Sequence, residues 1–363
     1  MCTYAVILAV YVDDILIFGN DTSFISNFKS ALCSQFSTKD LGQVSEILGM
    51  TVTRDRQNRT ISLQQTNYIR KLVSQYGLNP DIIEAKSTVP MTKSNWNTAV
   101  DIKHPLANEV GSSSDVDFPY RNLLGGILYT NVCCRPDISF AVSALASHNS
   151  NPKRMHWNAL VDLLSYVRDS QDLCITYGSS VSSDNLNQII VYADADFSRK
   201  PNVRKSRSGH VIYFNNGAIA WKSALQKKSP SISINNDSIS PDSSSDIASI
   251  ATSTSESELY AMFDAARAAK WFRELLRELG FPQRPTVCHE DNKGSFDWIT
   301  TPKISSRMVH LPLEIYWLRE SYEYGEFVYV LTPTEDQKAD IMTKQMDPKP
   351  FHKQLTMLYN LSY

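Results

Sequence analysis

The apolar and polar positions of the N-terminal part alternate between strand and helix periods. The predicted elements are a hairpin over 3–20, a helix over 23–36, a hairpin over 46–65 and a helix over 66–76. In the first hairpin the apolar runs flank Asp13 and Asp14, so both acids are expected at its tip. The second hairpin is expected to turn at 56–59, and Gly77 marks the end of the second helix.

The remaining chain has a helical middle and an α/β end. Helical spacing runs over 119–169, after a loop-like stretch over 79–118, and a Ser/Asn/Gly-rich linker follows. The predicted elements beyond it are a strand over 189–197, a hairpin over 208–223, a helix over 253–280, a strand over 285–291, helices over 292–300 and 311–325, a strand over 326–332 and a last helix over 334–346. Strands that come first and then alternate with helices predict an α/β (α+β) domain with a mixed sheet.

Composition sets limits on the class of protein. The chain has 363 residues, 42% hydrophobic and 20% charged, which suits a soluble protein of two or three domains. A net charge of -2 gives no global basic field, which weakens a nucleic-acid partner without excluding one. The six cysteines form no C-x-x-C pair, so neither a zinc site nor a disulfide framework is expected, and an intracellular, non-secreted setting is. The first apolar run is too short to cross a membrane.

In the second half of the chain, several acidic residues lie at the ends of predicted strands or on the apolar faces of predicted helices. In "VYADADF" the side chains of Asp194 and Asp196 share one face of a strand, so either one lies at the exposed end or a cation neutralises them. Of the two glutamates that begin the long helix, Glu258 precedes Leu259 and lies nearer the packed face. The other candidates are Asp291, which ends a strand, and Asp336 and Asp340, which we expect on one side of the last helix.

Several carboxylates drawn from different elements would suit a metal site. Like charges a few ångströms apart raise each other's pKa, and hard divalent cations such as Mg²⁺ relieve the repulsion through oxygen ligands. Two such ions can assist cleavage of a phosphodiester. Each acid alone has a plainer interpretation as a helix cap or a solvated charge, and sequence spacing does not show that the acids meet.

The chain resembles one family in stretches that follow the same order. "YVDDILIFGN", continued by "LCSQFSTKDLGQVSEILGMTV", resembles the palm end of a copia-type retrotransposon reverse transcriptase. The connecting region of the same Pol polyprotein resembles "YRNLLGGILYTNVCCRPDISFAVSALASHNSNPKRMHWNALVDLLSYV". Its ribonuclease H domain is similar to "YADADFSRKPNVRKSRSGHVIYFNNGAIAWKSALQKKS", "STSESELYAMFDAARAAKWFRELLRELG", "HEDNKGS" and "PTEDQKADIMTK".

The resemblance implies a ribonuclease H-like fold, with a five-stranded mixed sheet and flanking helices, and hydrolysis of the RNA strand of an RNA–DNA hybrid. It implies two Mg²⁺ ions, with Mn²⁺ as the alternative. The catalytic and metal-binding pattern falls on Asp194, Glu258, Asp291 and Asp340. As a hypothesis of our own, the basic residues Arg204, Lys205 and Arg207, or else Lys222, Lys227 and Lys228, contact phosphates of the hybrid. No membrane partner is expected.

The chain differs from the family pattern in ways that argue against polymerase activity. Asp13 and Asp14 resemble the paired catalytic aspartates of reverse transcriptases, although Asp is favoured at any hairpin tip. The chain starts about ten residues before this motif, so we expect polymerase activity to be lost by N-terminal truncation unless a partner chain supplies palm and fingers. Pro312 stands where the family has an acid, which makes His310 a structural residue in our interpretation.

The resemblance also predicts how the chain is divided. We expect a remnant of reverse transcriptase palm and thumb over 1–90, a helical connection over 91–180, and a ribonuclease H-like domain over 181–363 with a disordered Ser-rich insertion at about 229–246. The expected location is cytoplasm, nucleus or a virus-like particle. The alternative function is a catalytically inactive relic that at most binds nucleic acid.

Overall fold

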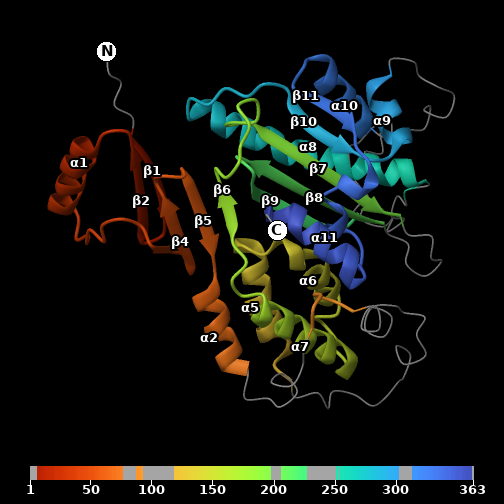
Figure 1. Cartoon of the computed structure of the whole chain (residues 1–363), viewed down its shortest axis with the longest axis horizontal. Helices are drawn as coiled ribbons and strands as arrows, with labels where there is room; N and C mark the ends of the chain where they lie inside the picture. Colours follow the sequence, from red (N-terminus) through yellow and green to blue (C-terminus); the bar gives the residue numbers. More distant parts are fainter. Residues whose placement is uncertain are drawn as a thin grey trace, which may run out of the picture.

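The computed structural model describes most of the chain (Figure 1). The described residues are 6–76, 87–92, 118–197, 206–226, 251, 253–301 and 313–361. Several sequence-based expectations therefore lie outside the described residues, namely those for Arg204, Lys205, Lys227, Lys228, His310, Pro312 and the Ser-rich stretch 229–246. Within the described part, no helix combines the length and the apolar character that crossing a membrane requires.

A five-stranded mixed sheet forms the centre of the second half. Its strands are β7 (Ile189–Asp196), β8 (Arg207–Phe214), β9 (Gly217–Leu225), β10 (Thr286–Glu290) and β11 (Phe327–Leu331). The order is β11-β10-β7-β8-β9, with β7, β8 and β9 antiparallel and with β10 parallel to both β7 and β11. The predicted fold class, a mixed five-stranded sheet flanked by helices, is confirmed.

One face of this sheet is covered by α8 (Thr254–Glu278), α9 (Lys293–Thr300) and α10 (Leu313–Glu323). The helix α8 begins at the cap Ser253, whose side chain accepts a hydrogen bond from the backbone of Glu256 at 3.2 Å. Its buried face contains Ala261, Ala265, Ala266 and Ala269. Because alanine side chains are small, the helix backbone lies close to the central strand β7.

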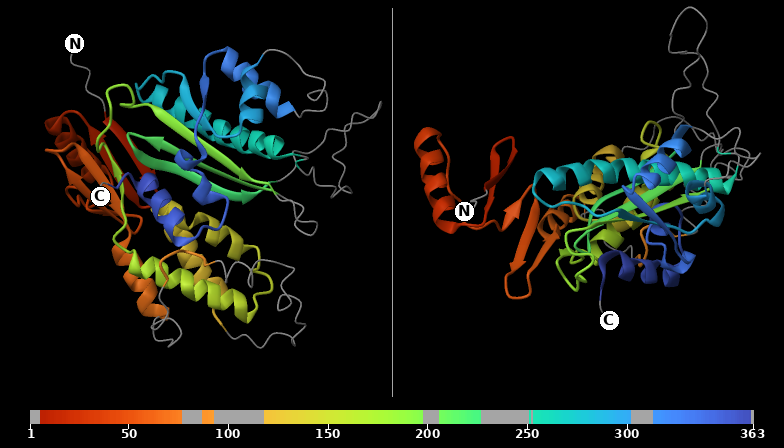
Figure 2. Two further views of the ribbon diagram at one scale, coloured as in Figure 1. Left: turned by 45° about the vertical axis from the view of Figure 1, so that its right-hand side comes forward. Right: turned by 90° about the horizontal axis from the view of Figure 1, so that it is seen from above.

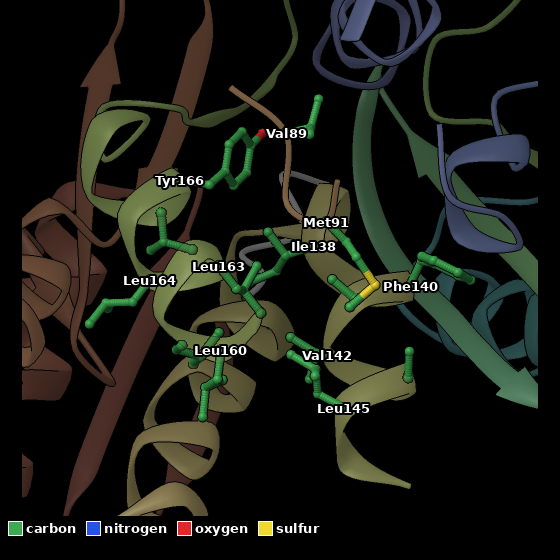
Figure 3. Packing of buried hydrophobic residues seen from close by; sticks show 14 of the residues in the cluster. Val89, Met91, Ile138, Phe140, Val142, Leu145, Leu160, Leu163, Leu164 and Tyr166 are labelled. Atoms are coloured by element: carbon green, nitrogen blue, oxygen red, sulfur yellow. The ribbon is translucent and has the colours of Figure 1, made fainter. Parts of the chain in front are cut away.

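The other face packs on helices from the middle of the chain and from its C-terminal end. These are α5 (Tyr120–Cys133), the 3-10 turn η2 (Pro136–Ile138), α6 (Ser139–Ala146), α7 (Arg154–Asp169) and α11 (Pro348–Tyr359). Figure 3 shows Leu160 and Leu163 of α7 directed toward Val142 and Leu145 of α6, beside Met91. One continuous apolar core therefore joins the helical middle to the sheet.

The N-terminal part builds two smaller sheets. One is the hairpin of β1 (Val6–Tyr11) and β2 (Asp14–Gly19), and the other contains β3 (Glu46–Ile47), β4 (Met50–Asp55), β5 (Thr60–Gln64) and β6 (Ile175–Tyr177). Both predicted hairpins are confirmed by their strand pairings. The helices are α1 (Thr22–Gln35) and α2 (Thr66–Tyr76). The first hairpin and α1 lie at one side of the molecule in Figure 1 and in the right-hand view of Figure 2.

Strand β6 was not among the predicted elements and links distant parts of the chain. It pairs with β5 and lies in the predicted connection region, so the four-stranded sheet draws on two of the three predicted parts. The three-part division of the chain stays a prediction.

The predicted last helix over 334–346 is wrong. The structure has two 3-10 turns there, η4 (Thr334–Asp336) and η5 (Asp340–Met342), followed by α11. The buried apolar residues are close together, at Ala339, Ile341 and Met342, which does not fit one stripe of an α-helix. The new helix starts at Pro348, whose fixed φ suits a first helical position.

Candidate metal centre

Asp194 lies on the central strand β7 and is 4% exposed, whereas Asp196 at the strand end is exposed. The residue opposite Asp194 in the neighbouring strand is Gly209. A Cβ atom at Gly209 would lie 2.5 Å from Cβ of Met342 and 2.7 Å from Cγ2 of Thr343. The missing side chain therefore lets the turn η5 pack directly on the sheet beside Asp194.

Three of the predicted acids lie close together near the C-terminal ends of strands β7 and β10. Carboxylate oxygens of Asp194, Asp291 and Asp340 all lie within 4.8 Å of one another. Asp291 directly follows β10, and Asp340 begins η5. The expectation that Asp336 and Asp340 share one side is wrong, because Asp336 is exposed and Asp340 is buried.

A second group of carboxylates adjoins the first and includes a residue that sequence reasoning missed. Glu258, Glu290 and Asp291 have carboxylate oxygens within 4.8 Å of one another, so Asp291 belongs to both groups. Glu258 is buried on α8, as predicted, and Glu256 is only half-buried. Glu290 is fully buried and lies two residues after the buried Cys288 on β10. This alternation was the available signal for an inward-facing Glu290.

The surroundings of these acids disfavour their charged forms. Burial, and next the nearby Asp340, raise the pKa of Asp194 to about 7. Burial likewise raises the pKa of Glu258 and of Glu290 well above the ordinary value, and neighbouring carboxylates add to this. Thr343 donates a hydrogen bond from its hydroxyl to Oδ2 of Asp194.

One cation faces the acids within the described part of the chain. Nζ of Lys344 donates to Oδ1 of Asp340 at 2.8 Å. Burial alone would lower the pKa of Lys344, but Asp194 and Asp340 outweigh it and raise that pKa. A single ammonium cannot neutralise five neighbouring carboxyl groups, so the cluster retains excess negative charge when its acids are ionised.

The donor set fits a hard divalent cation. Oε2 of Glu258 and Oε2 of Glu290 are buried and have no hydrogen-bond partner in the described structure. Carboxylate oxygens without a hydrogen-bond donor are available as ligands, and all-oxygen sites suit Mg²⁺ and Mn²⁺. Asp194, Asp291 and Asp340 could hold one cation, and Glu258, Glu290 and Asp291 a second.

Arg207, the described member of the predicted basic loop, is engaged inside the protein. It is 7% exposed and donates from Nη1 to the hydroxyls of Ser143 at 2.6 Å and Ser223 at 3.1 Å. Its guanidinium also lies 5.3 Å from the ring centroid of Phe140. These contacts support a structural role in joining β8 and β9 to α6.

The paired aspartates of the first hairpin are exposed at its turn. Asp13 is in the turn between the strands and Asp14 begins β2, and both are exposed. Among the described residues, neither belongs to a group of three or more potential ligands.

Comparison with known proteins supports the motif-based resemblance. A model of the reverse transcriptase (RNA-dependent DNA polymerase) family matches residues 2–93. The chain is 29% identical over 350 residues to the retrovirus-related Pol polyprotein from transposon TNT 1-94 of Nicotiana tabacum, covering 95% of this chain and 24% of that protein. It is 28% identical over 351 residues to the Pol polyprotein from transposon RE2 of Arabidopsis thaliana, covering 95% and 21%. The chain thus spans about a quarter of the length of these relatives.

A solved structure also matches part of the chain. It is LC11-RNase H1, isolated from compost by a metagenomic approach. The aligned region covers 44% of this chain and 94% of LC11-RNase H1, with a TM-score of 0.30 and 17% sequence identity. At this TM-score the match supports no conclusion about the site. The sequence matches confirm the resemblance: over 95% of its length, the chain is similar to the Pol polyproteins of copia-type retrotransposons.

Proposed function

We propose that the part of the chain built on the five-stranded sheet hydrolyses the RNA strand of an RNA–DNA hybrid in a reaction that depends on Mg²⁺ or Mn²⁺. One observation carries the proposal. Acids from four separate elements or element ends, Asp194, Glu258, Asp291 and Asp340, form with Glu290 two adjoining groups that share Asp291. Buried like charges are costly to a fold, and such groups are typical of functional sites.

The chain's own residues would hold and orient the metal centre. When bound, two divalent cations activate water and stabilise the leaving oxygen of a phosphodiester. Asp194 and Asp340 would hold one side of the centre and Glu258 the other, with Asp291 between them. The hydroxyl of Thr343 fixes the orientation of the Asp194 carboxylate, and the ammonium of Lys344 does the same for Asp340.

The choice of an RNA–DNA hybrid as substrate rests on the relationship to Pol polyproteins. Only the RNA strand has 2′-hydroxyls, and a hybrid differs in groove shape from both pure duplexes, so contacts to hydroxyls and shape distinguish the substrate. Arg204 and Lys205 remain our proposal for phosphate contacts. We also place the activity inside the cell.

The reverse transcriptase part of the chain supplies a second, incomplete motif. We propose that Asp13 and Asp14 are the paired aspartates of a polymerase site. Metal-assisted nucleotide transfer needs carboxylates gathered around the ions, and no third potential ligand groups with this pair in the described part of the chain. We therefore expect no DNA synthesis by this chain without a partner chain.

The test is cleavage of a hybrid whose RNA strand carries the label. With Mg²⁺, the parent protein should cleave the RNA strand and leave the DNA strand intact. Asp194→Asn should lower the rate by about 100-fold or more, since a ligand matters at least as much as an outer-shell partner. Asp196→Asn, on the same strand but exposed, is the matched control and should retain activity.

The outcomes separate the proposal from its alternative. If the folded parent protein does not cleave the hybrid with Mg²⁺ or Mn²⁺, the hydrolase proposal is wrong and an inactive relic that at most binds nucleic acid remains. Equal loss in Asp194→Asn and Asp196→Asn would also contradict the assigned role of Asp194.

A further inference from the structure

Gln337 lies between the three segments that carry the acids of the metal centre. Its side chain is fully buried. Nε2 donates to the carbonyl oxygen of Ala193 on β7 at 2.8 Å and, at a longer 3.4 Å, to that of His289 on β10. Oε1 accepts from the backbone N–H of Ala339 at 3.3 Å.

Each of these partners stands next to a candidate metal ligand in the sequence. Ala193 precedes Asp194, and Ala339 precedes Asp340. The third partner, His289, directly precedes Glu290 and is two residues before Asp291. One side chain thus connects the backbone of three acid-bearing segments that are otherwise far apart along the chain.

Gln337 lies where the pairing between the central strands β7 and β10 ends. The parallel pairing of β7 and β10 ends where Tyr192 lies opposite His289. Gln337 donates to both strands at this point, and its own carbonyl accepts from the N–H of Asp340 at 3.3 Å. The relative placement of β7, β10 and η5 therefore depends on a hydrogen-bonded bridge after the regular ladder has ended.

The hydrogen bonds made by Gln337 require both its amide group and the length of its side chain. The bridge needs two donors for carbonyl oxygens and one acceptor for a backbone N–H, which a glutamine supplies. Glutamate has no donor when ionised, methionine has the length without the polar groups, and asparagine has the groups with a shorter reach. Losing the amide would leave buried carbonyl and N–H groups unpaired.

We propose that Gln337 is a positioning residue of the metal centre. By bonding Ala193, His289 and Ala339, it sets the distances among Asp194, Asp291 and Asp340 before a cation binds. This inference rests on the proposed function, because it requires that these acids bind a divalent cation.

The test measures the Mn²⁺ dissociation constant by calorimetry, without nucleic acid and well below the unfolding temperature of each variant. Gln337→Met should weaken Mn²⁺ binding by about 10- to 100-fold, the usual effect of removing an outer-shell partner. Gln337→Asn, a smaller change, should also weaken binding. The control Gln354→Met alters a glutamine on α11 that is 5% exposed and lies outside both carboxylate groups, so its dissociation constant should match the parent protein.

Circular dichroism and unfolding temperature separate positioning from general stability. If Gln337→Met does not fold, Gln337→Asn carries the test. Mn²⁺ affinity within twofold of the parent protein in the folded Gln337 variants, with affinity lost in Asp194→Asn, would overturn the role of Gln337 alone. Affinity unchanged in Asp194→Asn as well would instead contradict the proposed metal centre.

Discussion

Asp137 and Asp194 are almost equally buried, at 2% and 4% exposure, but their surroundings are opposite. Asp137 accepts two hydrogen bonds from the guanidinium of Arg135, at 2.9 and 2.8 Å. It also accepts from the hydroxyls of Tyr166 at 2.7 Å and Tyr359 at 2.6 Å. Burial alone would raise the pKa of Asp137, but these partners, Arg135 first, lower it.

Asp194 has one hydroxyl donor, from Thr343, and faces further carboxylates. Its pKa is raised to about 7 by burial and then by Asp340. Burial alone therefore does not decide the direction in which the pKa of an aspartate shifts. The polypeptide itself completes the site of Asp137, whereas in our proposal a cation from outside would complete the site of Asp194.

The largest expected loss of stability comes from removing the cation that neutralises Asp137. Arg135→Met keeps the length of the side chain but leaves the Asp137 charge buried without its cation. We expect the free energy of unfolding to fall by about 3–5 kcal/mol, because an uncompensated buried charge is strongly destabilising. Urea unfolding of the parent protein and the variant, followed by circular dichroism, measures this difference.

An exposed ion pair provides the control for this prediction. Lys222 donates to Asp264 at 2.9 Å, and their side chains are 48% and 39% exposed. Lys222→Met should lower the free energy of unfolding by less than about 1 kcal/mol, since water solvates both charges. A loss in Arg135→Met as small as in Lys222→Met would mean that Asp137 does not depend on its cation.

Local sequence patterns and the family pattern predict much of the carboxylate cluster around Asp194. Strand alternation places Asp194 and Asp196 on one face, and the family pattern selects Asp194 between them. The packed face of the long helix identifies Glu258 in place of Glu256. The family pattern selects Asp340, although the predicted helix there is two 3-10 turns and Asp336 is exposed. Glu290 was missed even though alternation with Cys288 placed it inward.

The site of Asp137 could not be predicted from such patterns. Arg135 and Asp137 lie in a region with helical spacing, where the pair reads as solvated charge. The burial of this pair depends on Tyr359, which is 222 residues away in the sequence and lies on a helix that the apolar pattern did not predict. Contacts of this separation exist only after the core has formed, so periodicity contains no signal for them.

The pH dependence of stability should also distinguish Asp194 from Asp137. In metal-free protein the pKa of Asp194 is raised, so the folded state keeps a proton that the unfolded state has lost between about pH 4 and pH 7. Stability from this group is complete at low pH and is lost as pH rises through 7. Asp194→Asn cannot ionise and should therefore be more stable than the parent protein, by about 2–4 kcal/mol at pH 8.

The difference between Asp194→Asn and the parent protein should shrink toward zero near pH 4. Thermal unfolding of both proteins in EDTA between pH 4 and pH 8 measures this difference. Added Mg²⁺ should stabilise the parent protein and leave Asp194→Asn nearly unchanged. A variant less stable than the parent protein at pH 8 in EDTA would contradict the idea of an uncompensated carboxylate.

The smallest expected effect tests single hydroxyl donors. Tyr359→Phe removes the O–H that bonds the charged Asp137, and Tyr213→Phe removes a buried O–H that donates to the neutral carbonyl of Leu358 at 3.0 Å. Hydrogen bonds to charged groups contribute more, so Tyr359→Phe should cost about 1–2 kcal/mol and Tyr213→Phe about half as much. Urea unfolding at pH 7 compares the two.

Acid unfolding separates the two tyrosines further. Losing the Tyr359 donor raises the pKa of Asp137 toward its ordinary value. Because stability from an acid with a lowered pKa is present at neutral pH and is lost as pH falls, Tyr359→Phe should unfold at a higher pH than Tyr213→Phe. Equal acid midpoints would show that Arg135 and Tyr166 already hold the Asp137 charge without Tyr359, and the completed site would then depend on fewer partners than the structure provides.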